Sequence, residues 1–337
     1  MECIRMIAPR QLKFVNEEEP VLYGDEQALV NVAYTGICGG DMHPYLGESL
    51  SAKYGNIHGH EFTGTILDIR SNKRKDIRVG DKVVINPAIP CGKCTKCNQG
   101  LGYICEDCKV IGGELPGSLC KKIVVPVRSL HKLSEDTSLL DGVLIEPLAF
   151  AEHCTAGLDG QTIVILGQGP IGISCTMVAK HKKCKVIAVD IVEGQLEVSK
   201  KVGSDFTINS RVADPVASIK KIIDENGIDS IIDTVANSWS IDFSMQILNK
   251  GGIITFVGIP CEIIKVDFLK LVCREISIKT RYLYTDKEFS QAVNYVDKGI
   301  IDVTPLISGV FPFEKAQEAF EFKAENACMK VVIHNDG

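Results

Sequence analysis

Residues 161–190 read QTIVILGQGPIGISCTMVAKHKKCKVIAVD, and this stretch decides the fold. It begins with an apolar run at 161–166 and ends with a second apolar run that closes at Asp190. Between the two runs stands the pattern G-x-G-x-x-G, followed by apolar residues at helical spacing. A strand, a glycine turn, a helix and a second strand in this order predict the βαβ unit that binds dinucleotides.

Each glycine of the pattern has a separate physical role. Gly167 permits the tight turn, Gly169 lets the backbone approach a pyrophosphate, and Gly172 lets the helix pack closely on the strand. The helix N-terminus then offers unpaired N–H groups and a partial positive charge to the phosphates. A purely structural glycine turn is the alternative, and the complete βαβ unit makes it the weaker one. The cofactor-binding candidates at this turn are Gly167, Gly169, Pro170, Ile171 and Gly172.

Asp190 indicates which dinucleotide is bound. A carboxylate at the end of the second strand accepts hydrogen bonds from the adenosine ribose hydroxyls. It would repel a 2′-phosphate, and Glu193 adds a second negative charge nearby. No arginine follows closely, so we expect NAD rather than NADP.

Length and composition limit the class of protein. The chain has 337 residues, 45% of them hydrophobic, and a formal net charge of −6. This length suggests two domains, and an acidic balance argues against a nucleic-acid partner. No stretch approaches the roughly 18 apolar residues of a membrane span, and the N-terminus lacks a secretory signal pattern. We therefore expect a cytoplasmic protein with no membrane partner.

The chain changes character along its length. Short alternating apolar runs with glycine and proline breaks predict a mostly β region up to about residue 148. Strand and helix patterns then alternate as far as residue 281, which predicts a doubly wound parallel sheet in an α/β fold. The last part, 282–337, has two helical patterns and a strand at 330–333, and is too short for a core of its own. We expect it to pack onto the first region. The predicted strands of the middle region are 161–166, 185–190, 206–209, 229–233, 252–257 and 276–279.

Four cysteines form a compact cluster with the spacing C-x2-C-x2-C-x7-C. Four thiolates so close together are typical of a closed tetrahedral zinc site. An iron–sulfur cluster is the competing interpretation, but the bacterial ferredoxin run closes with x3 and a proline. A closed site has no open coordination position, so its role would be structural, within a lobe at about 88–108. The predicted ligands are Cys91, Cys94, Cys97 and Cys105.

A second group of metal-binding residue types lies nearer the N-terminus. Cys38 follows Gly36-Ile37, and Gly59 precedes His60 and Glu61. A cysteine, a histidine and a carboxylate can hold one zinc ion and leave its fourth position open. Taken singly, Cys38 could be a core residue and His60 a loop histidine. The other nine cysteines are expected to be core or surface thiols: Cys3, Cys108, Cys120, Cys154, Cys175, Cys184, Cys261, Cys273 and Cys328.

Together these motifs resemble the zinc-dependent medium-chain dehydrogenases over essentially the full chain. The matching pieces stand in the family's order: Gly36-Ile37-Cys38-Gly39 with Asp41 and His43, Gly59-His60-Glu61, Gly80-Asp81-Lys82-Val83, the four cysteines, Glu146-Pro147-Leu148, and the glycine turn. The glutamate of Glu-Pro-Leu is similar to the polyol, sugar-acid and threonine dehydrogenase branch. The resemblance implies a GroES-like mostly-β catalytic domain at 1–148 and 282–337, and a Rossmann NAD-binding domain at 149–281.

The resemblance also implies roles for individual residues. Cys38 and His60 would bind a catalytic zinc ion, and Glu61 would bind it or stand immediately behind its ligands. Glu146 would reach the metal directly or through water. Asp41 would orient the metal ligands, and His43 would lie on the path by which the alcohol proton leaves. The loop of Val257, Gly258 and Ile259 resembles the nicotinamide side of the cofactor site.

Two positions depart from the family's pattern. Gly40 stands where a serine or threonine hydroxyl normally passes the substrate proton onward. His58 stands where an aliphatic residue is common, and it faces either the pocket or a plain loop. The pair Arg281-Tyr282 resembles the arginine and tyrosine that polyol dehydrogenases place near the substrate, and Tyr45 is a further pocket candidate.

The function implied is hydride transfer from a secondary alcohol to NAD. The substrate would be a polyol, a sugar acid or a hydroxy amino acid, interconverted with its ketone. The implied cofactors are NAD and two zinc ions per chain, one catalytic and one structural. The alternative is an NAD- and zinc-binding protein with weak or lost catalysis, acting as a sensor or partner, and Gly40 favours it. Resemblance to the family further suggests a homodimer or homotetramer.

Overall fold

The chain forms two compact units. The computed structural model describes residues 1–48, 54–223, 226–260 and 263–335, so Cys261 lies outside the described residues. One unit is Met1–Glu146 with Thr285–Gly337, and the other is Pro147–Tyr284. These boundaries differ by two and three residues from those expected after 148 and 281. Among the described residues, no helix has the length and apolar content to cross a membrane.

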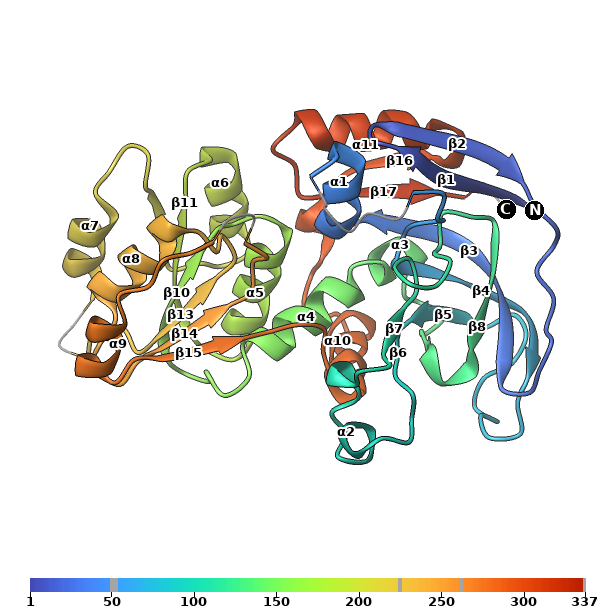
Figure 1. Ribbon diagram of the computed structural model, residues 1–337, viewed down its shortest axis with the longest axis horizontal. Coiled ribbons are helices and arrows are strands. Elements are labelled where there is room, and N and C mark those ends of the chain that lie inside the picture. Colours follow the sequence, from blue (N-terminus) through green and yellow to red (C-terminus); the bar gives the residue numbers. More distant parts are fainter. Residues whose placement is uncertain (49–53, 224–225, 261–262, 336–337) are drawn as a thin grey trace. The chain divides into compact units, whose positions relative to one another are not determined.

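The second unit is built on a six-stranded parallel sheet with the order β12-β11-β10-β13-β14-β15. Its central strands are apolar on both faces because helices cover both (Figure 1). The order reverses direction beside β10, which is the doubly wound topology expected from the sequence. The strands are β10 (Thr162–Leu166), β11 (Lys185–Asp190), β12 (Phe206–Asn209), β13 (Ser230–Asp233), β14 (Ile253–Phe256) and β15 (Ser277–Thr280).

Helices connect these strands and lie on the two faces of the sheet (Figure 1). The first two connections cover one face, and the next three cover the other. A right-handed crossover between parallel strands produces this arrangement. The helices are α5 (Pro170–His181), α6 (Glu193–Lys201), α7 (Pro215–Ile222), α8 (Ser238–Ile247) and α9 (Phe268–Arg274), preceded by α4 (Ile145–Cys154), which enters the unit.

The first unit is mostly β, as expected. Its main sheet has the order β16-β17-β3-β4-β5-β9, with β8 also paired to β3. The C-terminal strands β16 and β17 thus extend the sheet that the N-terminal region begins. The strands are β1 (Glu2–Ala8), β2 (Gln11–Asn16), β3 (Gln27–Ile37), β4 (Glu61–Arg70), β5 (Lys82–Ile85), β6 (Ala88–Ile89), β7 (Lys109–Val110), β8 (Lys122–Pro126), β9 (Leu130–Lys132), β16 (Ile307–Pro312) and β17 (Lys330–His334).

Short helices close the first unit. The apolar residues Phe313, Ala316 and Phe320, expected on one helical face, are all buried. The helical pattern at 313–322 is a 3-10 turn followed by a helix that runs three residues further than expected. The helices are α1 (Gly39–Leu46), α2 (Thr95–Asn98), α3 (Leu139–Gly142), α10 (Asp286–Asp297) and α11 (Ala316–Glu325).

Candidate metal and cofactor sites

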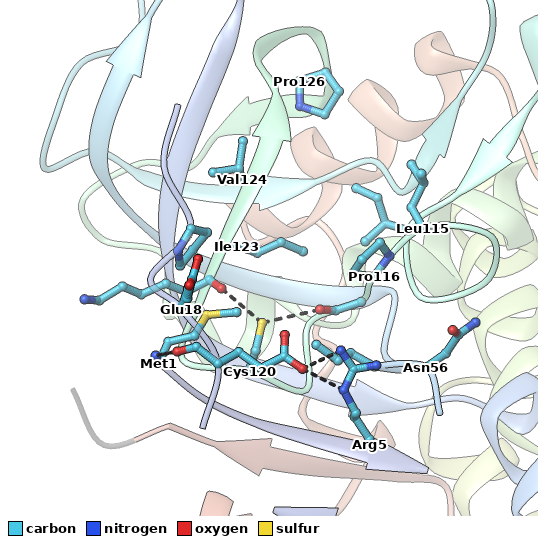
Figure 2. A pocket seen from close by; sticks show the side chains of 16 residues that line it. Met1, Arg5, Glu18, Asn56, Leu115, Pro116, Cys120, Ile123, Val124 and Pro126 are labelled. Carbon is cyan, nitrogen blue, oxygen red and sulfur yellow. Dashed lines mark hydrogen bonds and ion pairs between the residues drawn. The ribbon is translucent and has the colours of Figure 1, made fainter. Parts of the chain in front are cut away.

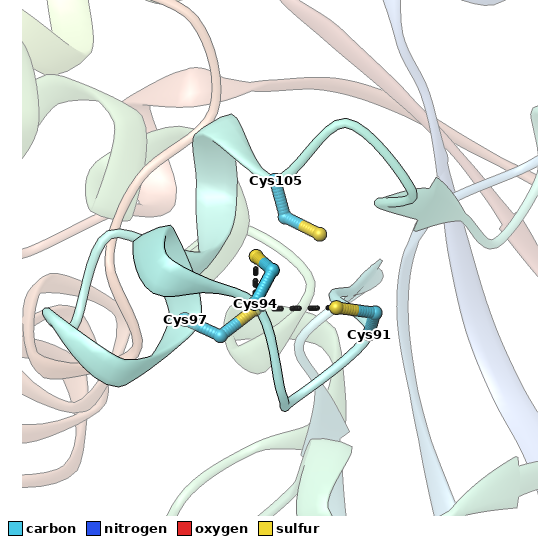
Figure 3. A group of neighbouring side chains, drawn as sticks. All are labelled: Cys91, Cys94, Cys97 and Cys105. Carbon is cyan, nitrogen blue, oxygen red and sulfur yellow. Dashed lines mark hydrogen bonds between the residues drawn. The ribbon is translucent and has the colours of Figure 1, made fainter.

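The four cysteines of the predicted structural site converge in the lobe around α2 (Figure 3). Cys94 is the N-cap of α2 and Cys97 lies within it. The Cys97 sulfur lies 3.5 Å from that of Cys94 and 3.9 Å from that of Cys91. A tetrahedral zinc ion with bonds of about 2.3 Å places its sulfurs about 3.8 Å apart. The observed spacing therefore matches a zinc site with sulfur at each corner.

The protonation of these thiols supports the same conclusion. Backbone N–H groups of Lys93 and Cys94 lower the pKa of Cys91 to about 6, so this sulfur is a ready thiolate. Desolvation and the neighbouring sulfurs raise the pKa of Cys97 to about 11. A metal ion would supply the positive charge that lets neighbouring cysteines ionise together. The cluster is a four-cysteine zinc site.

The second predicted group also comes together in the first unit. Cys38 is the N-cap of α1, directly after β3, and His60 and Glu61 lie where β4 begins. Because β3 and β4 are antiparallel neighbours, with Gly36 opposite Glu61, the end of one strand meets the start of the other. One donor atom from each of Cys38, His60 and Glu61 lies within 4.8 Å of the others.

Asp41 contacts both Cys38 and His60 and helps to fix their positions. Its Oδ2 accepts a hydrogen bond from the Cys38 N–H at 2.9 Å, and its Oδ1 lies 3.8 Å from Nδ1 of His60. Burial opposes the charge, but His60 and His58 outweigh burial and lower the pKa of Asp41 to about 2. An ionised Asp41 at Nδ1 leaves Nε2 of His60 as the nitrogen for a ligand bond.

Glu61 is held by a lysine that the motifs did not reveal. Lys330 on β17 donates from Nζ to Oε1 of Glu61 at 2.6 Å, and the two side chains are 2% and 0% exposed. Burial opposes the charge on Lys330, but Glu61 and Cys38 outweigh it and raise the pKa of Lys330. The second oxygen, Oε2, is buried and has no partner among the described residues. A Cβ at Gly36 would lie 2.4 Å from Oε2, so only glycine fits there.

A divalent cation fits these donors. Thiolate, imidazole and carboxylate are the ligands that zinc takes in proteins. Burial disfavours the charged imidazole, but Asp41, Cys38 and Glu146 outweigh it and raise the pKa of His60 well above its ordinary value. A proton on His60 thus balances an anionic site, and metal binding releases such a proton. Glu61 Oε2, which has no hydrogen-bond partner among the described residues, offers a further ligand atom for a cation.

Glu146 and His43 lie outside the group of three donors. Glu146 is 8% exposed and close enough to His60 to raise its pKa. His43 lies on α1 with its side chain 41% exposed, and its Nδ1 is 3.4 Å from Glu48. Its ring is therefore open to solvent, whereas Glu146 is buried.

The two departures from the family's pattern have different surroundings. Among the described residues, a Cβ at Gly40 would meet Cys38 and His60, both at 3.9 Å, so the position has room for a side chain. The Nδ1 of His58 lies 3.6 Å from Asp41, and its Nε2 is buried without a partner among the described residues.

Tyr45 is not a pocket residue: it is fully buried, and its hydroxyl accepts a hydrogen bond from Gln317.

The glycine turn of the second unit leaves space for a ligand. A Cβ at Gly172 would lie 1.9 Å from the Gly167 carbonyl oxygen, which explains the need for close packing. A Cβ at Gly169 would meet no atom within 4 Å in the part of the chain that the structure describes. Gly169 is also the N-cap of α5, and no side chain among the described residues caps that helix end. The open space and uncapped N–H groups fit the pyrophosphate of a dinucleotide.

Asp190 lies at the end of β11, as expected. Its carboxylate is 9% exposed and accepts hydrogen bonds from the N–H groups of Gln168 at 2.5 Å and Val192 at 2.8 Å. The structure also brings Arg211 near, because the next residue back, Ser210, donates its N–H to the Asp190 carbonyl at 2.9 Å. Arg211 and Asp190 are far apart in the sequence, so the motifs did not indicate that they are neighbours.

The loop after β14 carries the last cofactor candidates. The N–H groups of Val257 and Gly258 donate to the Asp233 carbonyl at 2.9 and 3.2 Å, which fixes the loop to the end of β13. Ile259 is 71% exposed. Arg281 donates from Nε to the His153 carbonyl at 3.1 Å, and Tyr282 is exposed.

Comparison with known proteins gives the family. Residues 170–298 match the zinc-binding dehydrogenase family, and residues 24–135 match the alcohol dehydrogenase GroES-like domain. D-xylulose reductase A of Aspergillus niger is 33% identical over 337 residues, covering 96% of this chain and 93% of the relative. The chain therefore belongs to the zinc-binding dehydrogenases, and it is a zinc-dependent, NAD(P)-linked enzyme of the alcohol and polyol dehydrogenase type.

Solved structures agree with this assignment. An alcohol dehydrogenase from Escherichia coli CFT073, complexed with NADH, is 28% identical, with a TM-score of 0.90 and 99% of each chain covered. L-idonate 5-dehydrogenase from Escherichia coli K-12 shares the fold at 23% identity, with a TM-score of 0.90 and coverage of 99% of this chain and 97% of that one. The family resemblance and the fold class predicted from the motifs are confirmed.

Proposed function

We propose that the protein oxidises a secondary alcohol with NAD at the site of Cys38, His60 and Glu61. The carrying observation is that these three donors lie within 4.8 Å of one another. A polyol is the first choice among the polyol, sugar acid and hydroxy amino acid classes. The relatives with 33% identity are called D-xylulose reductases, and reduction of a ketose gives a polyol.

In this mechanism each residue has a defined task. Zinc, when bound, would supply a Lewis acid that lowers the pKa of the substrate hydroxyl, and NAD would supply the hydride acceptor. Cys38 and His60 would hold the metal, and Glu146 or Glu61 would complete its ligands. Asp41 fixes the tautomer and orientation of His60. With no hydroxyl at Gly40, the alcohol proton passes through water to the exposed His43.

NAD is the proposed oxidant because of Asp190. Its carboxylate lies where an adenosine ribose is bound in the βαβ unit. It would repel the additional phosphate of NADP, although Arg211 lies near. Replacing Asp190 with Ser should therefore lower kcat/KM for NAD and raise it for NADP. Unchanged selectivity between the two cofactors would contradict this assignment.

The direct test combines metal content with turnover. The purified chain should hold two zinc ions, and a panel of polyols, sugar acids and amino alcohols should yield NADH with NAD. Cys38→Ala should remove one zinc ion and abolish turnover while the fold is retained. Cys273→Ala, at a thiol of α9 in the second unit, is the matched control and should change neither. Retained activity in Cys38→Ala would refute the site.

The alternative is a protein that binds NAD and zinc with weak or lost catalysis. Gly40 is the observation that favours it, because the position offers no hydroxyl for proton transfer. One zinc ion per chain together with no turnover across the substrate panel would establish this alternative. Two zinc ions and steady NADH formation would exclude it.

A further inference from the structure

Cys3 and Cys120 face one another in the first unit and take no part in the proposed reaction. Cys3 lies on β1, and Cys120 lies just before β8. The Ile4 N–H donates to the Leu119 carbonyl at 2.8 Å, and the Lys121 N–H donates to the Glu2 carbonyl at 3.0 Å. These two bonds bracket Cys3 and Cys120, which form an isolated antiparallel bridge.

This bonding pattern places the two residues at the close type of antiparallel pair. In such a pair the residues exchange no backbone hydrogen bonds with each other, and their Cα atoms are about 4.5 Å apart. Disulfides join Cα atoms separated by about 4.4–6.8 Å. Directly opposite residues also point their side chains to the same face. The backbone therefore presents Cys3 and Cys120 at disulfide distance.

A cavity lies beside Cys120, which is itself 1% exposed, and can bring a small molecule next to this residue. Cys120 lines a cavity of about 370 Å³, together with Arg5, Glu17 and several apolar side chains (Figure 2). Its thiol lies 3.4 Å from the Gly117 carbonyl oxygen and 3.2 Å from that of Lys122. Arg5 donates from Nε to Glu17 at 2.6 Å, so this wall of the cavity is polar.

We propose that Cys3 and Cys120 are an oxidation site, at which a hydroperoxide converts the two thiols into a disulfide. The Cys120 sulfur first attacks the peroxide, taking one oxygen to become a sulfenic acid and releasing water or an alcohol. The Cys3 thiol then displaces that oxygen as water, and the S–S bond forms. Two electrons leave the sulfurs, and the peroxide bond accepts them.

Burial of the two thiols makes this oxidation slow. Desolvation and Glu17 raise the pKa of Cys3 to about 11, against the opposing charge of Arg5. Desolvation and Cys3 likewise raise the pKa of Cys120. The thiolate is the reactive form, so the pair responds to sustained exposure to peroxide and not to a brief pulse.

A disulfide between Cys3 and Cys120 would affect the proposed metal site, because backbone hydrogen bonds join the segment before Cys120 to the loop before His60. The N–H groups of Ser118 and Leu119 donate to the carbonyls of Gly59 and His58, both at 2.9 Å. His60 follows immediately. A disulfide between Cys120 and Cys3 would fix the segment of Ser118 and Leu119 to β1. This segment positions the loop before His60. The oxidation itself does not depend on the proposed function.

Peptide mapping tests the proposal on the zinc-loaded protein. After treatment with hydrogen peroxide, free thiols are alkylated and the chain is cut with trypsin without reductant. Cleavage after Arg5, Lys109 and Lys121 releases Met1–Arg5 and Val110–Lys121, each with one cysteine. We expect these two peptides joined, two hydrogens lighter than their sum, in most of the protein, and separated again by dithiothreitol. Recovery of both peptides as alkylated thiols, or joined to other cysteines, would overturn the proposal.

Variants separate the pair from the other thiols. Cys120→Ser should leave Cys3 fully alkylated after peroxide, whereas Cys273→Ser, on α9 of the second unit, should leave the cross-link unchanged. Oxidation in concentrated urea should scatter the linkages among many cysteines. An equal yield of the Cys3–Cys120 link in urea would show that the folded geometry does not direct it. This comparison uses the unaltered chain, so it holds even if Cys120→Ser folds poorly.

Discussion

Lys330 carries a buried positive charge in the first unit and forms an ion pair with the buried carboxylate of Glu61. Removing one partner of a buried ion pair leaves the other charged and desolvated, which costs about 3–5 kcal/mol. We therefore expect Lys330→Met to lower the free energy of unfolding by about this amount, measured by urea denaturation of the zinc-loaded protein. Lys315→Met is the matched control, because the Lys315–Glu318 pair is 54% and 60% exposed. Equal losses in the two variants would show that burial of the pair is unimportant.

Gly40 gives the second prediction for a single residue. A serine there would contact Cys38 and His60 only at ordinary distances, so it fits without displacing either. Its hydroxyl would supply the proton path that the glycine lacks, and general acid–base assistance typically contributes about 10²–10⁴-fold, part of which water already supplies here. We expect Gly40→Ser to raise kcat several-fold, measured as NADH formation on the best polyol.

The control for this prediction is Gly39→Ser, which adds the same hydroxyl at a neighbouring position with open space. It should not raise kcat. A gain in both variants would point to a change in α1 in place of a proton path. No gain in either would leave water and His43 as a sufficient route.

Spacing along the chain determined how much of the candidate sites the sequence could predict. Cys91 to Cys105 lie within one short segment, so their spacing alone predicted the cluster. Lys330 is 269 residues from Glu61 in sequence, and only the pairing of β17 with β3 brings it near. Arg211 was missed for the same reason, since β12 pairs with β11.

Secondary structure elements were predictable where their apolar pattern was continuous. Strands β11 and β12 have the bounds that the sequence predicted, because both are short apolar runs closed by polar residues. The helix expected near 313 begins as a 3-10 turn at Phe313–Lys315, and α11 follows. Both forms bury Phe313 and Phe320, so the hydrophobic pattern could not distinguish them.

The turn before β5 gives a prediction that depends on pH. Asp81 is 9% exposed, and its carboxylate meets Lys132 at 2.9 Å and the Arg78 N–H at 2.9 Å. Burial raises the pKa of Asp81, but these contacts outweigh it and lower the pKa below 3.8. The carboxylate therefore stabilises the fold above about pH 4, and this contribution is lost as pH falls through the lowered pKa.

Asp81→Asn should accordingly lower the free energy of unfolding by about 1–2 kcal/mol near pH 7, since Lys132 is partly exposed and its charge is screened. The difference from the unaltered chain should shrink as pH falls from 6 towards 3. Asp68→Asn, on β4, is a control at a carboxylate that accepts the neighbouring Ile69 N–H at 2.8 Å. A difference that stays constant with pH would contradict the ionic origin of the effect.

At the scale of the whole molecule, the second unit exposes an apolar surface that a monomer would leave in water. Strand β15 is an edge strand of the six-stranded sheet, and all four of its residues are exposed. On α9 beside it, Phe268, Leu269 and Val272 are 70–73% exposed. An unpaired edge and a cluster of large apolar side chains are typical of a covered interface.

We therefore propose that a second copy of the chain covers β15 and α9, in line with the expected homodimer or homotetramer. Light scattering should give a mass of at least twice 36.8 kDa at micromolar concentration. Val272→Glu places a charge in this surface and should shift the population to monomer, with a dissociation constant at least tenfold higher, because an unpaired charge is costly to bury. Val212→Glu, at an apolar position that is 80% exposed outside the surface, should leave the mass unchanged. If Val272→Glu keeps the assembly intact, the interface lies elsewhere on the chain, because a helix so exposed tolerates glutamate unless a partner covers it.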